Sequence, residues 1–414
     1  MAASMCRRLT LLPRRISLFS PHNFVQFAKC EYSTVEPATE ELVEVPQAKY
    51  PPIIPPFHGK TKESEEYRTQ AAIAELNARP TAKDMIYELS KQQKWHYIIN
   101  PTCFHNSFLN LYKHCMKTVM VDSLPEQLEE LAKTEEVEEV ATRLKPHVID
   151  CILQEHLYTY RHRGDLVKRD YHVGKQTMEN VMRVMLTGLS ADMPHLRDGE
   201  TDEDVNVKAF WKRDTTRFQF IGTQLFAIRS KDPLPEFISR DSELSVGEVP
   251  SWPYAPENVS VFKRHINPDC FPGYKVGNPY NFGHTQIYVP SFDRLRCKKQ
   301  NLLEDVLMGC GLSASFGWLH SLAMYNMFNP YKDLTQPMTC QTIVTNGSKF
   351  SFFCYQLNTL GLSERSHDNP LRNVCWHTED LSLYGDIKDG KVRDFNNEVL
   401  KMMVAFLMKR TVSP

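Results

Sequence analysis

Hydrophobic and polar positions alternate most clearly between Met338 and Leu360. Two runs rich in β-branched and aromatic residues are joined there by Asn346 and Gly347. An Asn-Gly pair favours a type I′ turn, in which both central residues have positive φ, and this turn closes two-residue hairpins. Phe352 and Phe353 alternate with other apolar residues, so both faces of the second run are apolar. The pattern predicts a β-hairpin whose second strand is covered on both sides, in the middle of a sheet.

Helical spacing surrounds this hairpin. Apolar residues follow a helical period over residues 302–328 and again over 395–406, at the C-terminal end. Residues 373–376 are predicted to form another strand, and Asp389-Gly390 marks a turn. From about residue 205, short aromatic runs separated by Pro, Gly, Asn and Asp indicate strands and long loops. Residues 201–414 are therefore expected to form a mixed α/β domain.

Residues 66–200 are predicted to be mainly helical. Thr81 followed by Asp84 is typical of a capped helix start, and Pro146 suits the first turn of another helix. Between these points, the acidic segment 122–140 favours a solvated helix or a flexible connector. The chain as a whole is thus predicted to be of the α+β class, with a helical region followed by a mixed α/β domain.

The first 65 residues differ from the rest. Residues 1–35 carry Arg7, Arg8, Arg14 and Arg15 between apolar residues and have no acid before Glu31, which is typical of a mitochondrial presequence. A disordered basic tail is the alternative. Residues 36–65 are rich in proline and have no hydrophobic period, which predicts an extended arm laid over another surface.

Composition excludes several classes of protein. The hydrophobic content of 42% and the charged content of 24% are ordinary for a globular chain of 414 residues. The longest apolar stretches are too short and too interrupted for a membrane span. The 11 cysteines include no C-x-x-C pair, and Cys151, Cys310 and Cys354 fall in apolar runs that predict buried free thiols.

Candidate catalytic and metal-binding patterns are incomplete. Around Ser313 and Ser315, the segment Gly311–Gly317 lacks one glycine of a nucleophile elbow and lies in a helical pattern, so close helix packing explains it better. His156 and His162 are six residues apart, which does not suit a zinc helix. His284 opens a strand without an assignable nucleophile and is interpreted as structural. The nucleotide fingerprints are absent, so no cofactor, metal or small-molecule substrate is predicted.

Basic clusters are the remaining candidate sites. Each could neutralise RNA phosphates, although solvated surface is the ordinary reading of such clusters. The formal charge is −1 for the whole chain and −5 without residues 1–35, so RNA contact is expected to be local and protein contacts to dominate. The RNA-contact candidates are Arg161, Arg163, Lys168, Arg169, Lys212, Arg213, Arg294, Arg296, Lys298 and Lys299.

Several blocks of sequence resemble one known family. FSFFCYQLNTL at 350–360 and NPLRNVCWHTEDLSLY at 369–384 are similar to the C-terminal signature of the mitochondrial ribosomal protein family of programmed cell death protein 9. KYPPI (49–53), LQEHLYTYRHR (153–163), FW (210–211) and GHTQIYVPSFDRLR (283–296) follow the same family order. The acidic segment 122–140 has no counterpart in this resemblance.

The resemblance implies a non-enzymatic component of the mitochondrial ribosome. The family was first assigned to the small subunit and later to the large one, where its members pair with a paralogous large-subunit protein. Large-subunit proteins and mitochondrial rRNA are thus the expected partners, and no catalytic residues are implied. The alternative is a mitochondrial matrix enzyme, RNA-acting or hydrolytic, whose site the sequence does not reveal.

Overall fold

The predicted hairpin lies inside a ten-stranded mixed sheet in the computed structural model of the chain. The structure describes residues 62–101, 108–160, 166–259, 261–290 and 301–412, and side chains are not described at 62–63, 108, 159–160, 166–172 and 301–306. Strands β7 (Met338–Thr345) and β8 (Lys349–Leu357) pair antiparallel, and β9 (Asn373–His377) pairs antiparallel with β8 on its other side. The central position of the second hairpin strand is confirmed.

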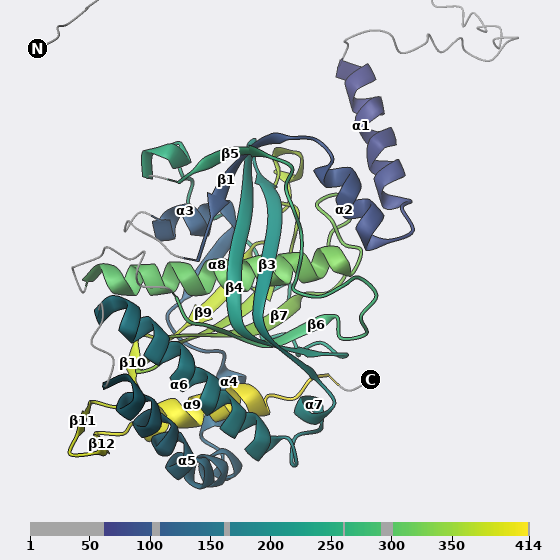
Figure 1. The fold of residues 1–414 in the computed structure, drawn as a ribbon. Helices are drawn as coiled ribbons and strands as arrows, with labels where there is room; N and C mark the ends of the chain where they lie inside the picture. Colours follow the sequence, from purple (N-terminus) through teal and green to yellow (C-terminus); the bar gives the residue numbers. More distant parts are fainter. Residues whose placement is uncertain (1–61, 102–107, 161–165, 260, 291–300, 413–414) are drawn as a thin grey trace, which may run out of the picture. The chain divides into compact units, whose positions relative to one another are not determined.

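The main path of the sheet runs in the order β2-β9-β8-β7-β6-β4-β1-β5, with β3 paired to β4 and β10 to β8 (Figure 1). The other strands are β1 (Lys94–Ile99), β2 (Thr118–Val121), β3 (Glu200–Arg213), β4 (Thr216–Ser230), β5 (Lys263–Ile266), β6 (Phe282–Tyr288) and β10 (Leu381–Ser382), and β11 (Asp386–Lys388) and β12 (Lys391–Arg393) form a separate hairpin. The helices are α1 (Lys62–Asn77), α2 (Ala82–Ser90), α3 (Phe108–Cys115), α4 (Glu126–Ala132), α5 (Glu135–Tyr160), α6 (Leu166–Leu189), α7 (Pro194–Arg197), α8 (Asn301–Tyr325) and α9 (Asn397–Met408). This mixture of helices and a mixed sheet confirms the α+β class.

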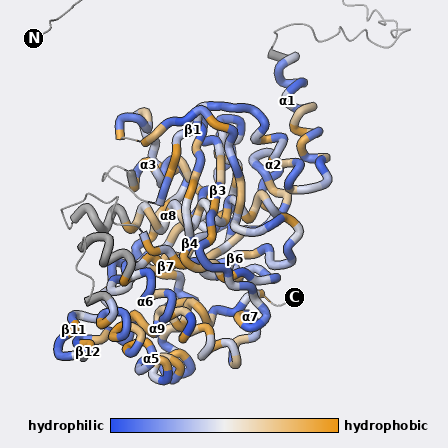
Figure 2. Tube along the Cα trace, viewed as in Figure 1, coloured by the Kyte–Doolittle hydropathy of each residue, from blue (hydrophilic) through white to orange (hydrophobic). Residues whose placement is uncertain are grey.

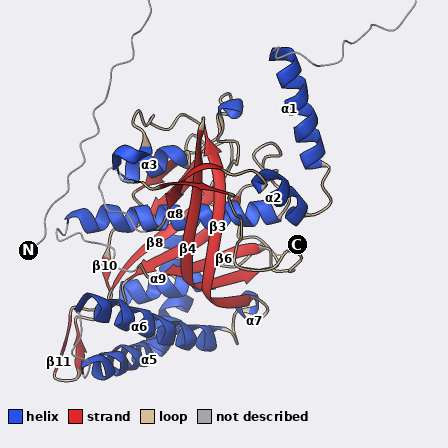
Figure 3. Cartoon of the chain, turned by 45° about the horizontal axis from the view of Figure 1, so that its top comes forward, coloured by secondary structure: helices blue, strands red, loops and turns tan. Residues whose placement is uncertain are grey.

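Helices cover both faces of the hairpin strands. Phe353 and Tyr355 pack on the side of α8, whereas Phe352 packs on the side of α9, where its ring lies 5.1 Å from that of Phe406. Figures 1 and 3 show α8 on one side of these strands and α5, α6 and α9 on the other. Hydrophobic residues accordingly gather along the strands and the helices packed on them (Figure 2). The apolar character of both strand faces is explained by this double cover.

Glycines bring α8 close to the sheet. A Cβ at Gly311 would lie 2.3 Å from a ring carbon of Phe353, and one at Gly317 would lie 2.4 Å from a ring carbon of Phe220. Ser315 Oγ donates a hydrogen bond to the Gly311 carbonyl inside the helix. The small residues of Gly311–Gly317 therefore serve close helix packing, as the sequence predicted.

The turn of the hairpin differs from the predicted type I′ geometry. The amide of Asn346 pairs with the Lys349 carbonyl, so the central residues are Gly347 and Ser348, and of these only Gly347 has positive φ, at +92°. The Asn346 side chain accepts hydrogen bonds from the amides of Ser348 and Lys349. Local side-chain bonding thus shifted the turn by one residue.

Two further details depart from the sequence reading of residues 66–200. Strands β1 and β2 arise in this range and join the sheet, through β4 and β9 respectively. Pro146 lies inside α5 and not at its start, because the helix begins at Glu135 within the acidic segment.

Thr81 caps α2 as predicted, since its Oγ1 accepts from the Asp84 amide at 3.1 Å. Cys151, Cys310 and Cys354 are buried, as expected.

Candidate nucleic-acid interface

Most of the predicted RNA-contact residues lie where the structure gives no side chains. Arg161, Arg163, Arg294, Arg296, Lys298 and Lys299 are outside the described residues. Lys168 and Arg169 lie near the start of α6, and only their position in the helix is described. Lys212 and Arg213, at the end of β3, are described in full.

Lys212 and Arg213 belong to different environments, because successive side chains of a strand point to opposite faces. Arg213 is tied into the fold: its Nη1 donates to the Leu362 carbonyl at 3.3 Å and lies 3.6 Å from the Asp214 carboxylate. Lys212 instead lines a pocket of about 590 Å³. Contact of either residue with RNA stays a prediction, and Lys212 is the one that lines the pocket.

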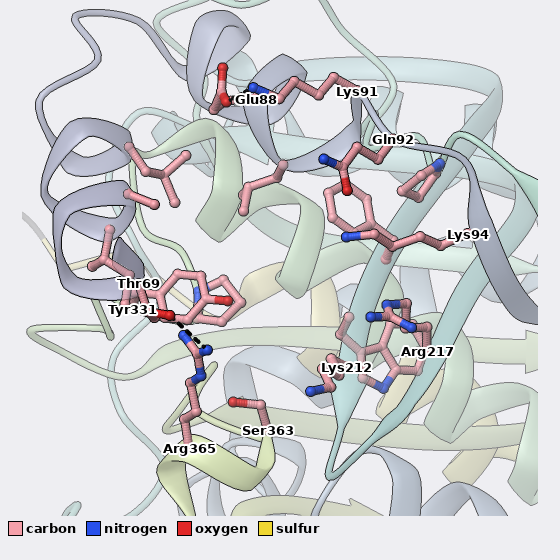
Figure 4. Close-up of a pocket in the computed structure, with 18 of the residues that line it drawn as sticks. Thr69, Glu88, Lys91, Gln92, Lys94, Lys212, Arg217, Tyr331, Ser363 and Arg365 are labelled. Atoms are coloured by element: carbon pink, nitrogen blue, oxygen red, sulfur yellow. Dashed lines mark hydrogen bonds and ion pairs between the residues drawn. The ribbon is translucent and has the colours of Figure 1, made fainter. Parts of the chain in front are cut away.

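The pocket collects cations from three strands. Lys94 of β1, Lys212 of β3 and Arg217 of β4 line it together, and Figure 4 shows the three side chains near one another. Lys212 is the direct cross-strand partner of Arg217, so both lie on the same face of the sheet. Helices α1 and α2 supply much of the opposite wall, and Arg365 lies beside Thr69 there, donating to its Oγ1 at 3.2 Å.

The pocket is electropositive. Among the described residues, no carboxylate lies within ion-pair distance of Lys94, Lys212 or Arg217. Burial lowers the pKa of Lys94, and the positive charges of Arg217 and Lys212 lower it further. Glu88 is the acid found in the described lining, and it is already paired with Lys91 and Arg79. An anion in this space would relieve repulsion between like charges.

A hydroxyl group without a partner also lines the pocket. Ser363 is 7% exposed, and its Oγ has no hydrogen-bond partner in the described part of the chain. A buried hydroxyl normally has one. Cations together with an available O–H donor suit a phosphate group, which accepts hydrogen bonds and carries negative charge. The lining is therefore chemically suited to a phosphate group.

The other chemical candidates are structural in the described chain. His284 Nε2 donates to the Lys409 carbonyl at 2.7 Å, and its Nδ1 lies 2.9 Å from Thr285 Oγ1, so the ring is held inside the fold. No group of three or more His, Cys, Asp or Glu residues is placed to hold a metal among the described residues. His156 is half-buried, and His162 lies outside the described residues. Searching the same residues reveals no helix with the length and apolarity needed to cross a bilayer.

Sequence reasoning found Lys212 and missed Lys94 and Arg217. Neither missed residue lies in a dense basic cluster, and Lys94 is 118 positions from Lys212 in the sequence, and only the sheet brings the two together. The one available signal was strand alternation around Lys212 and Arg217, two residues either side of the Asp214–Thr215 turn. No strand was predicted at Lys94, so the residues that lie beside Lys94 in the sheet could not be predicted either.

The sequence of this chain matches the model of a known protein family. The profile of the family described as Mitochondrial 28S ribosomal protein S30 (PDCD9) matches residues 14–219 and 214–411. Because these two ranges include most of the sequence, the chain belongs to this family of mitochondrial ribosomal proteins. The resemblance inferred from the C-terminal blocks is confirmed.

Individual relatives share only part of their sequence with this chain, at low identity. The chain is 30% identical over 179 residues to Large ribosomal subunit protein mL37 of Bos taurus, a match that covers 42% of this chain and 40% of the relative. It is 25% identical over 276 residues to the protein of that name from Rattus norvegicus, covering 65% of this chain and 61% of the relative. The corresponding Gallus gallus protein is 27% identical over 203 residues, covering 47% and 45%. The chain thus matches less than two thirds of the length of these relatives.

Proposed function

We propose that this protein is a structural constituent of the large subunit of the mitochondrial ribosome, where it supports mitochondrial translation. The observation that carries the proposal is the family match over residues 14–219 and 214–411. The relatives named as large-subunit proteins favour the large subunit over the small one. The mitochondrial matrix is the corresponding location, and residues 1–35 are proposed as the presequence that directs import.

Its proposed partners are large-subunit proteins, including a paralogous family member, and mitochondrial rRNA at a few local positions. The pocket of Lys94, Lys212 and Arg217 supports one such RNA contact, because these cations lack carboxylate partners in the described chain. The proline-rich residues 36–65 are proposed to lie over a neighbouring surface. The proposed role is non-enzymatic, because membership of a ribosomal protein family implies a structural one.

Sedimentation tests this function. A tagged full-length protein, expressed in cells, is expected to move with the large subunit when mitochondrial lysate is separated on a sucrose gradient. It should also remain with the large subunit when low magnesium separates the two subunits. Movement with the small subunit would contradict the subunit assignment. A protein found only at the top of the gradient would instead favour a free matrix enzyme.

A further inference from the structure

Strand β5 ends the main path of the sheet and leaves an edge open. It pairs antiparallel with β1 from Lys94↔Ile266 to Tyr97↔Lys263, and no other described strand pairs with it. Its sequence is basic: Lys263, Arg264 and His265 follow one another and are all exposed. We use the name β5 edge for Trp95, Phe262, Arg264 and His265.

Two large aromatic side chains are exposed on the β5 edge. Trp95 is 57% exposed and Phe262 is 69% exposed. In contrast, Trp211, Trp318 and Trp376 are each exposed by 3% or less. The Trp95 ring lies 5.2 Å from the ring of His265, its direct cross-strand partner. The pair of strands therefore holds Trp95 in place while leaving much of its surface to solvent.

Trp95 and His265 lie on one face of these two strands, and Arg264 lies on the other. Phe262, whose carbonyl accepts from the Ile98 amide, follows the alternation onto the face of Arg264. Arg264 is the cross-strand partner of His96, which lines the cationic pocket with Lys94. Directly opposed residues share a face, so Arg264 extends the face that carries Lys94, Lys212 and Arg217. Among the described residues, no carboxylate lies within ion-pair distance of Arg264, whereas Lys263 pairs with Glu257 at 3.0 Å. Phe262 therefore lies on the continuous basic face, whereas Trp95 lies on the opposite face of the same edge.

Protection of the sheet edge explains only part of this arrangement. Charged residues on an edge strand prevent pairing with other chains, which accounts for Lys263 and Arg264. It does not account for Trp95 and Phe262, whose exposure adds apolar surface where protection would require polar residues. Bases of single-stranded nucleic acid stack on such rings, while their phosphates contact neighbouring cations. In a duplex the base faces are already stacked on one another.

We propose that the β5 edge binds a single-stranded segment of RNA. Trp95 stacks on an unpaired base on one face of the edge, and Phe262 stacks on another base on the opposite face. Arg264 contacts the backbone, which passes over the open edge of β5 and continues toward the pocket of Lys94, Lys212 and Arg217. The identification of this RNA as an unpaired segment of rRNA rests on the proposed function. The stacking chemistry itself depends only on the exposed rings and the neighbouring cations.

Direct binding measurements test the proposal. Fluorescence anisotropy of a labelled oligouridine of about 10 nucleotides is measured with the full-length protein, and a blunt RNA duplex of the same length serves as competitor. Trp95→Ala is expected to weaken binding about tenfold, the effect of losing one stacked base, while Trp95→Phe keeps most of the affinity. Arg264→Ala should lower the slope of log affinity against log salt by about 0.7.

Tyr158→Ala is the matched control, because Tyr158 is 65% exposed on α5, on the other side of the fold. Since Trp95 and Phe262 are exposed, their variants are expected to keep the wild-type unfolding midpoint, which is measured alongside. Equal binding by wild type and a Trp95→Ala/Phe262→Ala variant would overturn the proposal. So would equal affinity for duplex and single strand, or failure of the wild type to bind oligouridine. Wild-type protein that binds oligouridine but sediments apart from the large subunit would support this site and contradict the proposed function.

Discussion

Individual buried histidines show how differently the fold treats the same residue type. His284 and His320 are both buried, and burial lowers the pKa of each to about 3. His284 has hydrogen-bond partners for both ring nitrogens. His320 has none in the described chain, and it packs against Phe316 and Trp211 at ring distances of 5.4 and 6.0 Å. His320 is therefore a buried polar side chain whose hydrogen-bonding capacity is unused.

These histidines make stability depend on pH. Their folded pKa of about 3 lies below the unfolded value of about 6.5, so between these values the unfolded chain binds more protons. The free energy of unfolding is thus expected to fall as pH drops from about 6.5 toward 3. In that window His320→Phe should flatten the dependence by about 1.4 kcal/mol per pH unit. Urea unfolding at several pH values measures this effect.

The exposed His367 provides the control for this experiment, since His367→Phe removes an imidazole without removing a buried one. An unchanged slope in the His320→Phe variant would contradict the account. The same variant is expected to be more stable than wild type at neutral pH, because a buried group without partners is replaced by an apolar ring.

At the scale of single elements, the sequence predicted those helices and strands whose residues follow a local hydrophobic period. The hairpin strands, α8, α9 and the cap at Thr81 were all visible as repeats or caps. The turn at Asn346 was misplaced by one residue because side-chain hydrogen bonds, which no pattern records, decided it. Positive φ at both central residues, as in a type I′ turn, occurs instead at Asp389 (+53°) and Gly390 (+69°). Strands β1 and β2 were hidden among helices, because only pairing with distant strands stabilises them.

The same limit applies to the candidate site. Lys212 stood out beside Arg213 in the sequence, but its partnership with Arg217 and Lys94 depends on strand register. Trp95 carried no sequence signal, because an exposed and a buried tryptophan read alike until the neighbours on the sheet are known. Residues that come together only through pairing of distant strands could therefore be identified only from the structure.

The hairpin turn packs against α6 through a pair of glycines. A Cβ at Gly347 would lie 2.6 Å from the Cα of Gly174, and Gly347 also has φ of +92°. Gly277 has the same φ, but a Cβ there would meet nothing within 4 Å. Alanine at either position should cost roughly 1–3 kcal/mol of backbone strain. Gly347→Ala should cost about 1–3 kcal/mol more, through overpacking against α6.

Thermal and urea unfolding of the two alanine variants measures this difference. Hydrogen exchange adds a local readout, since the amides of β8 should lose protection in Gly347→Ala and keep it in Gly277→Ala. If both variants lose the same free energy of unfolding, the contact between the turn and α6 contributes nothing to stability.

At the scale of the whole molecule, the negative net charge disfavours binding of RNA, whereas the local cations favour it. The formal charge is −1, and it becomes −5 without residues 1–35, so long-range attraction to RNA is weak. The described cationic face is small, with Lys94, Lys212 and Arg217 as its centre. At a slope of about 0.7 per contact for single-stranded RNA, about three phosphate contacts would lose roughly twentyfold in affinity between 50 and 200 mM salt, compared with roughly three hundredfold for six contacts. The protein is therefore expected to depend on protein contacts more than on RNA for its place in the particle.

A salt-wash series on purified large subunits tests this balance. Moderate salt should release strongly basic ribosomal proteins before this one, because their attachment depends on more phosphate contacts. Deleting residues 36–60 should weaken retention more than replacing Lys94, Lys212 and Arg217 by alanine, since the proline-rich arm is expected to supply salt-insensitive contacts. Early release of the wild type, with a steep salt slope that flattens in the triple alanine variant, would contradict this expectation. RNA contact through the cationic face would then be the main anchor.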